Sequence, residues 1–225
     1  MSPARDEFLL RPASARDVDA VLAVKRALAM PARPGETATG GFILGAEREA
    51  YRQLIAGGCV ELLEVCGRVV GYAVALPDPA LRASDIWRRR AAIRWVQGFD
   101  PQPFEPEPIA YFDQLAVLPG IHVRAYGAVL GLRALAKLFA AGHRHALTTT
   151  LRAPVRNAAA HAYLRRIGAR LVGQLDETYA GVGAVVSDIY HLDRDTFLAR
   201  LGRYRGAPPR VAGLAERAVA GTGLA

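Results

Sequence analysis

Residues 115–135, LAVLPGIHVRAYGAVLGLRAL, combine residue types that could bind phosphate groups. An apolar run stops at Pro119 and apolar residues then recur at helical spacing, which predicts a loop leading from a strand into a helix. The first turn of a helix carries unpaired backbone N–H groups and a partial positive charge, and both attract phosphate. Gly127 would let the backbone approach such a ligand, while His122 and Arg124 would add donors. The alternative for Gly127 is that it only lets this helix pack closely on a sheet.

A second stretch, residues 157–168 with the sequence NAAAHAYLRRIG, is typical of a short helix with a face of small side chains. Asn157 suits the N-cap position of that helix, and Gly168 suits the residue that ends it. The stretch therefore predicts a helix over residues 157–167.

Histidine and cysteine do not occur at the spacing of a metal site. His143 and His145 are two residues apart, but no third ligand follows nearby, so we expect surface or strand-entry residues. Cys59 and Cys66 lie in apolar runs without a second cysteine pair, and we interpret both as buried thiols. We expect neither a metal site nor a disulfide scaffold.

The hydrophobic pattern predicts strands alternating with helices, and hence an α/β sheet. Expected strands cover 8–11, 109–117, 145–151, 170–175 and 185–192, with a hairpin over 59–77 that turns at 66–68. Expected helices cover 14–29, 46–56, 122–141 and 157–167. The strands that flank helix 122–141 should be parallel, because a helical crossover joins parallel strands. On the first helix, residues at roughly helical spacing are Val18, Val21, Leu22, Lys25 and Leu28.

Two segments differ from this pattern. Residues 78–108 combine an expected Arg-rich helix over 80–97 with a proline-dense stretch, and we interpret them as an insertion. Residues 204–225 contain mainly Ala, Gly and Pro with scattered Arg, and we expect a flexible or loosely docked tail. Residues 1–203, including this insertion, are expected to form one domain.

The composition is that of a globular protein, with 225 residues of which 52% are hydrophobic and 22% charged. The net charge is +8, and Lys25 and Lys137 are the only lysines beside 27 arginines. Arginine favours bidentate binding of phosphate or carboxylate, although a GC-rich genome would give the same bias without any function. No segment reaches the ~18 uninterrupted apolar residues of a membrane span, so we expect no membrane partner and a cytoplasmic location.

The two stretches, in this order and separation, resemble the signatures of the GNAT superfamily of acyl-CoA-dependent N-acyltransferases. The resemblance covers about residues 8–193. It implies an α/β (α+β) fold in which a twisted mixed sheet of six to seven strands has helices on both faces. Three residues depart from the common pattern: His122 stands where the family usually has Arg, and Val123 and Ala125 stand where it usually has Gly.

The same resemblance implies acetyl-CoA as co-substrate. The strand around Ala116 and Val117 would offer backbone groups to its pantetheine arm, and Asn157 would reach that arm from the second helix. The alternative for Asn157 is that it serves only as an N-cap. The residues assigned to cofactor binding are Leu115, Ala116, Val117, His122, Val123, Arg124, Ala125, Tyr126, Gly127, Ala128, Asn157 and Ala160.

Acyl transfer to an amine needs a base for the amine and a proton for the leaving thiolate. Asp113 is our candidate base, because it precedes the cofactor loop and shares a strand face with Tyr111; its alternative is a structural carboxylate. The family's general acid is usually a Tyr seven residues after the Asn, where this chain has Leu164. Tyr163 is therefore the candidate acid, with Tyr126 as a fallback and a core or stacking role as the alternative for either.

These features predict an N-acetyltransferase in which the primary amine of a small molecule or a peptide attacks the thioester directly. A first alternative is a CoA-binding protein of the same fold without catalytic competence. A second is a nucleic-acid-binding module that uses residues 82–94, although we expect no nucleic-acid partner. Whether the protein forms a homodimer is left open.

Overall fold

The computed structural model describes residues 8–45, 47–103, 105–120 and 123–224. An eight-stranded sheet has the order β1-β3-β4-β6-β7-β10-β9-β5, somewhat larger than the six to seven strands expected. Its strands are β1 (Phe8–Pro12), β3 (Val60–Val65), β4 (Arg68–Leu76), β5 (Arg94–Trp95), β6 (Ile109–Val117), β7 (His145–Ala153), β9 (Arg170–Tyr179) and β10 (Gly183–Asp193). A separate parallel pair joins β2 (Gly35–Thr37) to β8 (Val155–Asn157).

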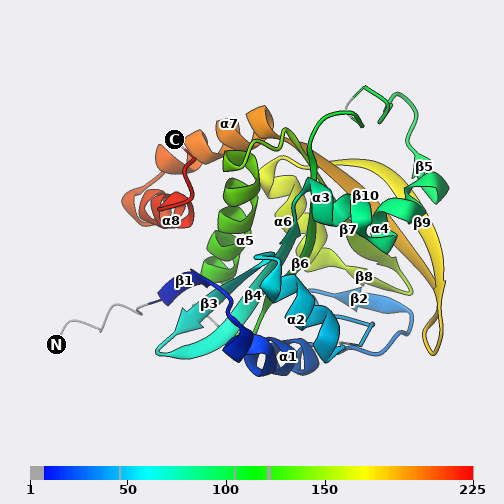
Figure 1. Ribbon diagram of the computed structural model, residues 1–225, viewed down its shortest axis with the longest axis horizontal. Helices are drawn as coiled ribbons and strands as arrows, with labels where there is room; N and C mark the ends of the chain where they lie inside the picture. Colours follow the sequence, from blue (N-terminus) through cyan, green and yellow to red (C-terminus); the bar gives the residue numbers. More distant parts are fainter. Residues whose placement is uncertain (1–7, 46, 104, 121–122, 225) are drawn as a thin grey trace.

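Helices cover both faces of the large sheet, as expected (Figure 1). One face carries α1 (Val18–Ala27), α2 (Arg48–Ala56) and α3 (Asp78–Ala83), with α4 (Asp85–Arg89) following α3. The other carries α5 (Val123–Ala140), α6 (Ala158–Ile167), α7 (Arg194–Arg205) and α8 (Pro209–Val219). Successive residues of a strand point to opposite faces, so Leu62 enters one core and Leu63 the other. Short 3-10 turns precede α1 (Ala15–Asp17) and follow α4 (Arg90–Ala92).

The strands β6 and β7, which flank α5, are parallel as predicted, but they pair only at their beginnings. The register runs from Ile109 opposite His145 to Tyr111 opposite Leu147 and ends there, although both strands continue. On its other edge β6 stays paired with β4 as far as Val117. Because β6 keeps one partner and leaves the other, the sheet opens between β6 and β7.

A β-bulge lies at the place where β6 leaves β7. In the pairing with β4, Val74 faces Gln114 whereas the next residue, Ala75, faces Phe112. Asp113 is therefore the extra residue of the bulge. Bulges bend a strand and redirect a side chain, and they occur often beside active sites.

The Arg-rich segment does not form the expected single helix over 80–97. Ser84 is extended (φ −86°, ψ 159°), ends α3, and accepts a hydrogen bond from the backbone N of Trp87 at 3.3 Å as the N-cap of α4. The chain is extended again at Ile93, and β5 pairs with Gln174 and Gly173 of β9. Local capping and strand pairing thus outweigh the helix propensity of the run.

Residues 204–224, where the composition favours a flexible tail, lie in the end of α7 and in α8 and the turn after it. Ala215 and Ala218 of α8 are buried in the core that α5 also enters. Small side chains let α8 approach α5 closely, so an alanine-rich segment docks here rather than staying loose. No helix among the described residues is both long and apolar enough to cross a membrane.

One expectation about a single residue is wrong. Cys66 is exposed, because it occupies a tight turn with φ +49° between β3 and β4, whereas Cys59 is buried as expected. His143 lies at the entry to β7, one of the two placements expected, and is buried there: its Nε2 accepts a hydrogen bond from the backbone N of Asp78 at 2.9 Å. A ring nitrogen that accepts from a helix start fixes α3 against the end of α5, which explains the burial.

Candidate acyl-transfer cleft

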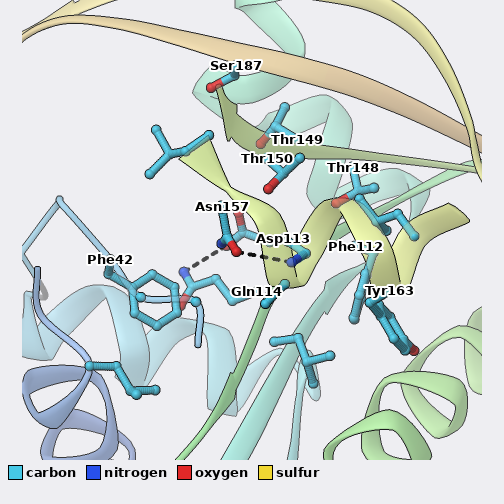
Figure 2. A pocket seen from close by; sticks show the side chains of 18 of the residues that line it. Phe42, Phe112, Asp113, Gln114, Thr148, Thr149, Thr150, Asn157, Tyr163 and Ser187 are labelled. Atoms are coloured by element: carbon cyan, nitrogen blue, oxygen red, sulfur yellow. Dashed lines mark hydrogen bonds between the residues drawn. The ribbon is translucent and has the colours of Figure 1, made fainter. Parts of the chain in front are cut away.

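A cleft of about 610 Å³ opens where β6 and β7 part (Figure 2). Residues 112–115 of β6 form one wall, and residues 148–151 of β7 form the other. The start of α6 and the loop of residues 38–44 close two further sides. The hydroxyl groups of Thr148, Thr149, Thr150 and Ser187 make the β7 and β10 side polar.

A hydrogen-bond chain holds Asp113 in this cleft. The amide nitrogen of Gln114 donates to Oδ2 of Asp113 at 2.9 Å. The amide oxygen of Gln114 accepts from the hydroxyls of Tyr51 at 2.6 Å and Tyr72 at 2.8 Å. Because both ends of the amide are used, Gln114 cannot rotate without losing bonds, and it fixes the orientation of the Asp113 carboxyl.

The surroundings of Asp113 raise the pKa of its carboxyl above the ordinary Asp value. Burial raises the pKa of the carboxyl, while the hydrogen bond from Gln114 and the positive charges of Lys25 and Arg89 act in the opposite direction. The neighbouring Tyr111 hydroxyl lies 2.6 Å from the Thr149 hydroxyl, and burial also raises its pKa. A carboxyl with a raised pKa is better matched to accept a proton near neutral pH than an ordinary Asp.

Asn157 lies at the entrance of α6, where the helix joins the cleft. Its Oδ1 accepts from the backbone N of Ala160 at 3.0 Å, so it is the N-cap of α6 as predicted. Asn157 and Ala160 both line the cleft, and a side chain at Gly40 would lie 3.8 Å from the Asn157 amide oxygen. The cap therefore also faces the loop that covers the cleft, and a ligand role for Asn157 stays a prediction.

Two glycines of α5 let this helix lie close to the cleft walls. A Cβ at Gly127 would come within 2.7 Å of Cγ2 of Val117, so close packing on β6, the alternative for this residue, is present. A Cβ at Gly131 would come within 2.3 Å of the Tyr163 hydroxyl. That hydroxyl donates to the carbonyl oxygen of Ala128 at a long 3.5 Å, and burial raises its pKa. Figure 2 shows the Tyr163 ring turned toward α5 and away from Asp113.

The structure brings together part of the expected cofactor set. The cleft-lining members are Leu115, Val117, Gly127, Ala128, Asn157 and Ala160. Ala116 is instead buried within the sheet opposite Tyr72, because it is the residue of β6 that points to the other face. Ala125 is exposed, and Tyr126 stacks on Phe8 with ring centroids 4.3 Å apart, outside the cleft lining. His122 and the side chains of Val123 and Arg124 lie outside the described residues.

Several cleft residues were not singled out from the sequence as site residues. Arg89 of α4 forms an ion pair with Glu177 of β9 and donates to the Tyr179 hydroxyl at 2.6 Å, and that hydroxyl donates to Glu177 at 2.8 Å. Lys25 and Phe42 lie on the side of α1 and the covering loop. Lys25 carried a signal as a charged residue among apolar ones on one helix face. Phe42 and Arg89 lie in segments 31–45 and 78–108, which the sequence places beside the acceptor without indicating these two residues.

Two features of the cleft could receive an extended ligand that carries phosphate. Leu118 and Pro119, which precede α5, and Gly127 within α5 all line it, so the chain leads from the cleft wall into the start of this helix. The edge of β6 beyond Tyr111 has no strand partner and faces the cleft, where an extended arm could pair with it. Within the described ranges, no group of three His, Cys, Asp or Glu could hold a metal ion.

Comparison with known proteins gives a match at the level of structure only. No protein-family model matches the sequence, and no curated protein matches it either. Among solved structures, the apo form of a mutant agmatine N-acetyltransferase superposes with a TM-score of 0.59 at 16% identity, covering 84% of this chain and all (100%) of that one. The ribosomal-protein-S18-alanine N-acetyltransferase of Escherichia coli gives 0.54 at 13%, covering 83% and 94%. A chain of the NatC complex bound to Gag peptide and CoA gives 0.52 at 13%, covering 83% and 99%.

The fold of this chain is therefore that of the GNAT N-acetyltransferases. The parted strands, the helix that starts at the mouth of the cleft and the bulge at Asp113 are the features of this fold that bear on chemistry.

Proposed function

We propose that this protein is an N-acetyltransferase that transfers the acetyl group of acetyl-CoA to a primary amine. The observation that carries the proposal is the opening between β6 and β7, with the half-buried Asp113 at the bulge inside it. Solved structures of the same fold are acetyltransferases of small amines or of proteins, and one holds CoA. The cytoplasmic location expected from the sequence stays a prediction.

The chain offers a binding site along the whole length of such a cofactor. The first turn of α5 would bind the phosphates, while the free edge of β6 near Leu115 and Val117 and the Asn157 amide would hold the pantetheine arm. When bound, acetyl-CoA would supply an acetyl group whose thiolate leaves readily. Gly127 and Ala128 keep the inner wall free of large side chains.

Asp113 would prepare the acceptor amine. An alkylammonium with a pKa of about 10.4 must lose a proton at pH 7, which costs about 4.6 kcal/mol. In the cleft the ammonium loses its hydration, and the Asp113 carboxylate accepts the proton, which lowers that cost. The neutral amine then forms the amide bond and the carbon–sulfur bond breaks. The nitrogen gives up its second proton to solvent, the thiolate takes a proton from solvent, and Asp113 returns its own proton to solvent before the next turnover. Backbone N–H groups on the free edge of β6 would stabilise the negative charge that develops on the carbonyl oxygen.

Tyr163 would act by packing rather than as the acid. Its hydroxyl contacts Gly131 and bonds to Ala128 inside the protein. A thiolate is a good leaving group, so protonation from solvent suffices. Tyr163 then holds α6 at the correct distance from α5.

The nucleic-acid alternative finds little support, because the arginines of residues 82–94 pair with acidic side chains of the same chain. The pairs are Arg82 with Asp78, Arg88 with Asp85, Arg89 with Glu177, Arg90 with Glu105 and Arg94 with Asp176. Paired arginines release fewer counterions from a phosphate backbone than free ones. A CoA-binding protein without activity is the stronger rival.

The test combines acetyl-CoA binding with thiol release on a panel of primary amines. We expect acetyl-CoA to raise the melting temperature and thiol to be released with at least one amine. Asp113→Asn should lower turnover by about a hundredfold or more while acetyl-CoA affinity changes little. Asp195→Asn, an exposed acid in the first turn of α7, is the matched control and should keep full turnover. Tight binding with no turnover on any amine would favour the rival, and unchanged turnover in Asp113→Asn would remove that residue from the mechanism.

A further inference from the structure

Lys25 is a buried cation on a wall of the cleft. Its side chain extends from α1 with 8% of the residue exposed. The ammonium lies 4.8 Å from the ring centroid of Phe42 and 5.5 Å from that of Tyr51. Burial lowers the pKa of Lys25, and the charge of Asp113 partly opposes this. Within the described part of the chain, no carboxylate lies within ion-pair distance of this ammonium.

The buried Lys25 ammonium lacks a hydrogen-bonding anion. Two aromatic rings attract a cation, but they do not replace the hydrogen bonds that an ammonium makes in water. Arg89, the other cation near Asp113, is already paired with Glu177 and also donates to the Tyr179 hydroxyl. Among the described residues in this part of the cleft, the Lys25 ammonium is therefore the one cation without a hydrogen-bonded counter-charge.

The position of Lys25 relates it to the acceptor amine. Lys25 on α1, Arg89 on α4 and Asp113 all line the cleft, and both cations are close enough to act electrostatically on the carboxyl. Phe42, one of the rings beside Lys25, and Gln114 both line the cleft. An acceptor whose amine faces Asp113 would place the rest of its chain within reach of Lys25.

We propose that Lys25 binds a carboxylate of the acceptor, so that the substrates of this cleft are small amino carboxylates. The inference rests on the proposed acetyl transfer and specifies its substrate class. One unpaired ammonium matches one carboxylate, whereas a phosphate would carry more charge than the site neutralises. A diamine would bring a second cation toward Lys25 and is disfavoured by like-charge repulsion.

The experiment compares amino acids with the amines that remain when the carboxylate is removed. α-Alanine and β-alanine are each paired with ethylamine, and δ-aminovalerate is paired with both n-butylamine and cadaverine. Thiol release from acetyl-CoA gives kcat and KM for each acceptor. We expect at least one amino carboxylate to exceed its matched amine in kcat/KM by about tenfold or more, the effect of a hydrogen bond to a charged group.

Substitutions then assign the preference to Lys25. Lys25→Met keeps the length and the packing against Phe42 and should abolish the preference, mainly by raising KM. Lys25→Arg keeps the charge and should retain most of it. Lys137→Met removes the only other lysine, which pairs with Glu61 away from the cleft, and should keep the preference. Acetyl-CoA binding by each variant, measured as a thermal shift, checks that the cleft is intact.

The outcomes separate the two proposals. Thiol release with all amines at equal efficiency, or a carboxylate preference that survives in Lys25→Met, would overturn the substrate class and leave acetyl transfer standing. Acetyl-CoA binding without thiol release on any acceptor would overturn both.

Discussion

The contact between Gly131 and Tyr163 allows a direct test of what Tyr163 does. A methyl group at Gly131 would lie 2.3 Å from the Tyr163 hydroxyl oxygen, 2.9 Å from Cζ and 3.1 Å from Cδ2 of Leu115. The first two distances are too short for any real contact, so Gly131→Ala must displace the ring. Tyr163→Phe alone removes only a hydroxyl whose one hydrogen bond is 3.5 Å long.

The expected free energies follow from these contacts. Alanine in place of glycine inside a helix gains about 1 kcal/mol, whereas overpacking costs about 1–3 kcal/mol. We expect Gly131→Ala to lower the free energy of unfolding by roughly 1 kcal/mol and Tyr163→Phe to lower it by about 0.5 kcal/mol. In the double variant the shortest contact is gone, so it should be more stable than the sum of the single changes by about 1 kcal/mol. Gly202→Ala in α7, where a Cβ meets nothing within 4 Å, is the control and should stabilise.

Urea unfolding of the wild type, the two single variants and the double variant measures the coupling between Gly131 and Tyr163. Thiol release by the same proteins measures the contribution of Tyr163 to catalysis. A general acid contributes about 10²–10⁴-fold to turnover, and we expect Tyr163→Phe to lose less than about tenfold. Additive effects within about 0.5 kcal/mol would show that the hydroxyl does not rest on Gly131. A loss of about a hundredfold in turnover with unchanged acetyl-CoA affinity would show that Tyr163 is the acid after all.

Three further outcomes are expected. Gly127→Val should push α5 away from Val117 and lower acetyl-CoA affinity at least about tenfold in calorimetry, while Gly213→Val in open space on α8 should not. Burial raises the pKa of Asp113, so kcat/KM should rise with pH, and the apparent pKa of this rise should lie above the ordinary Asp value of about 3.9. A pH profile without this rise would contradict the assignment of Asp113 as the base. Two hydrogen bonds of 2.8 Å from Arg11 lower the pKa of Asp17. Asp17→Asn should therefore lower the free energy of unfolding by about 2 kcal/mol above pH ~4, and the difference from wild type should shrink as the pH falls below ~4. A difference independent of pH would refute the role of this ion pair.

The elements around the cleft were predictable because their patterns are local. The alternation over residues 109–117 predicted β6 with the observed bounds, and Asn157 and Gly168 predicted the start and end of α6. The parallel relation of β6 and β7 followed from the helical crossover between them. In each case the signal lies within one element or its immediate flanks.

The geometry of the site depends on partners far away in the sequence, so it could not be predicted. The bulge at Asp113 appears only in the pairing of β6 with β4, and no feature of the alternation indicates it. The helix expected over 80–97 ends early because Arg94 and Trp95 form a strand, β5, that pairs with Gln174 and Gly173 of β9. Lys25 was placed on the apolar face of its helix by spacing, but its aromatic partner Phe42 comes from a loop without any periodic pattern.

Tyr51 contacts both Lys25 and Gln114, the residue that holds Asp113, so variants of Tyr51 can test the roles of Lys25 and Asp113 separately. Its ring lies beside the Lys25 ammonium, while its hydroxyl donates to Gln114, which holds Asp113. Burial raises the pKa of Tyr51 to about 12, so the hydroxyl remains a donor at neutral pH. Tyr51→Phe keeps the ring and leaves Gln114 with the bond from Tyr72, so turnover should fall modestly while the acceptor preference persists. Tyr51→Leu removes ring and hydroxyl together and should weaken both; equal acceptor preference in the Leu and Phe variants would show that the ring does not support Lys25.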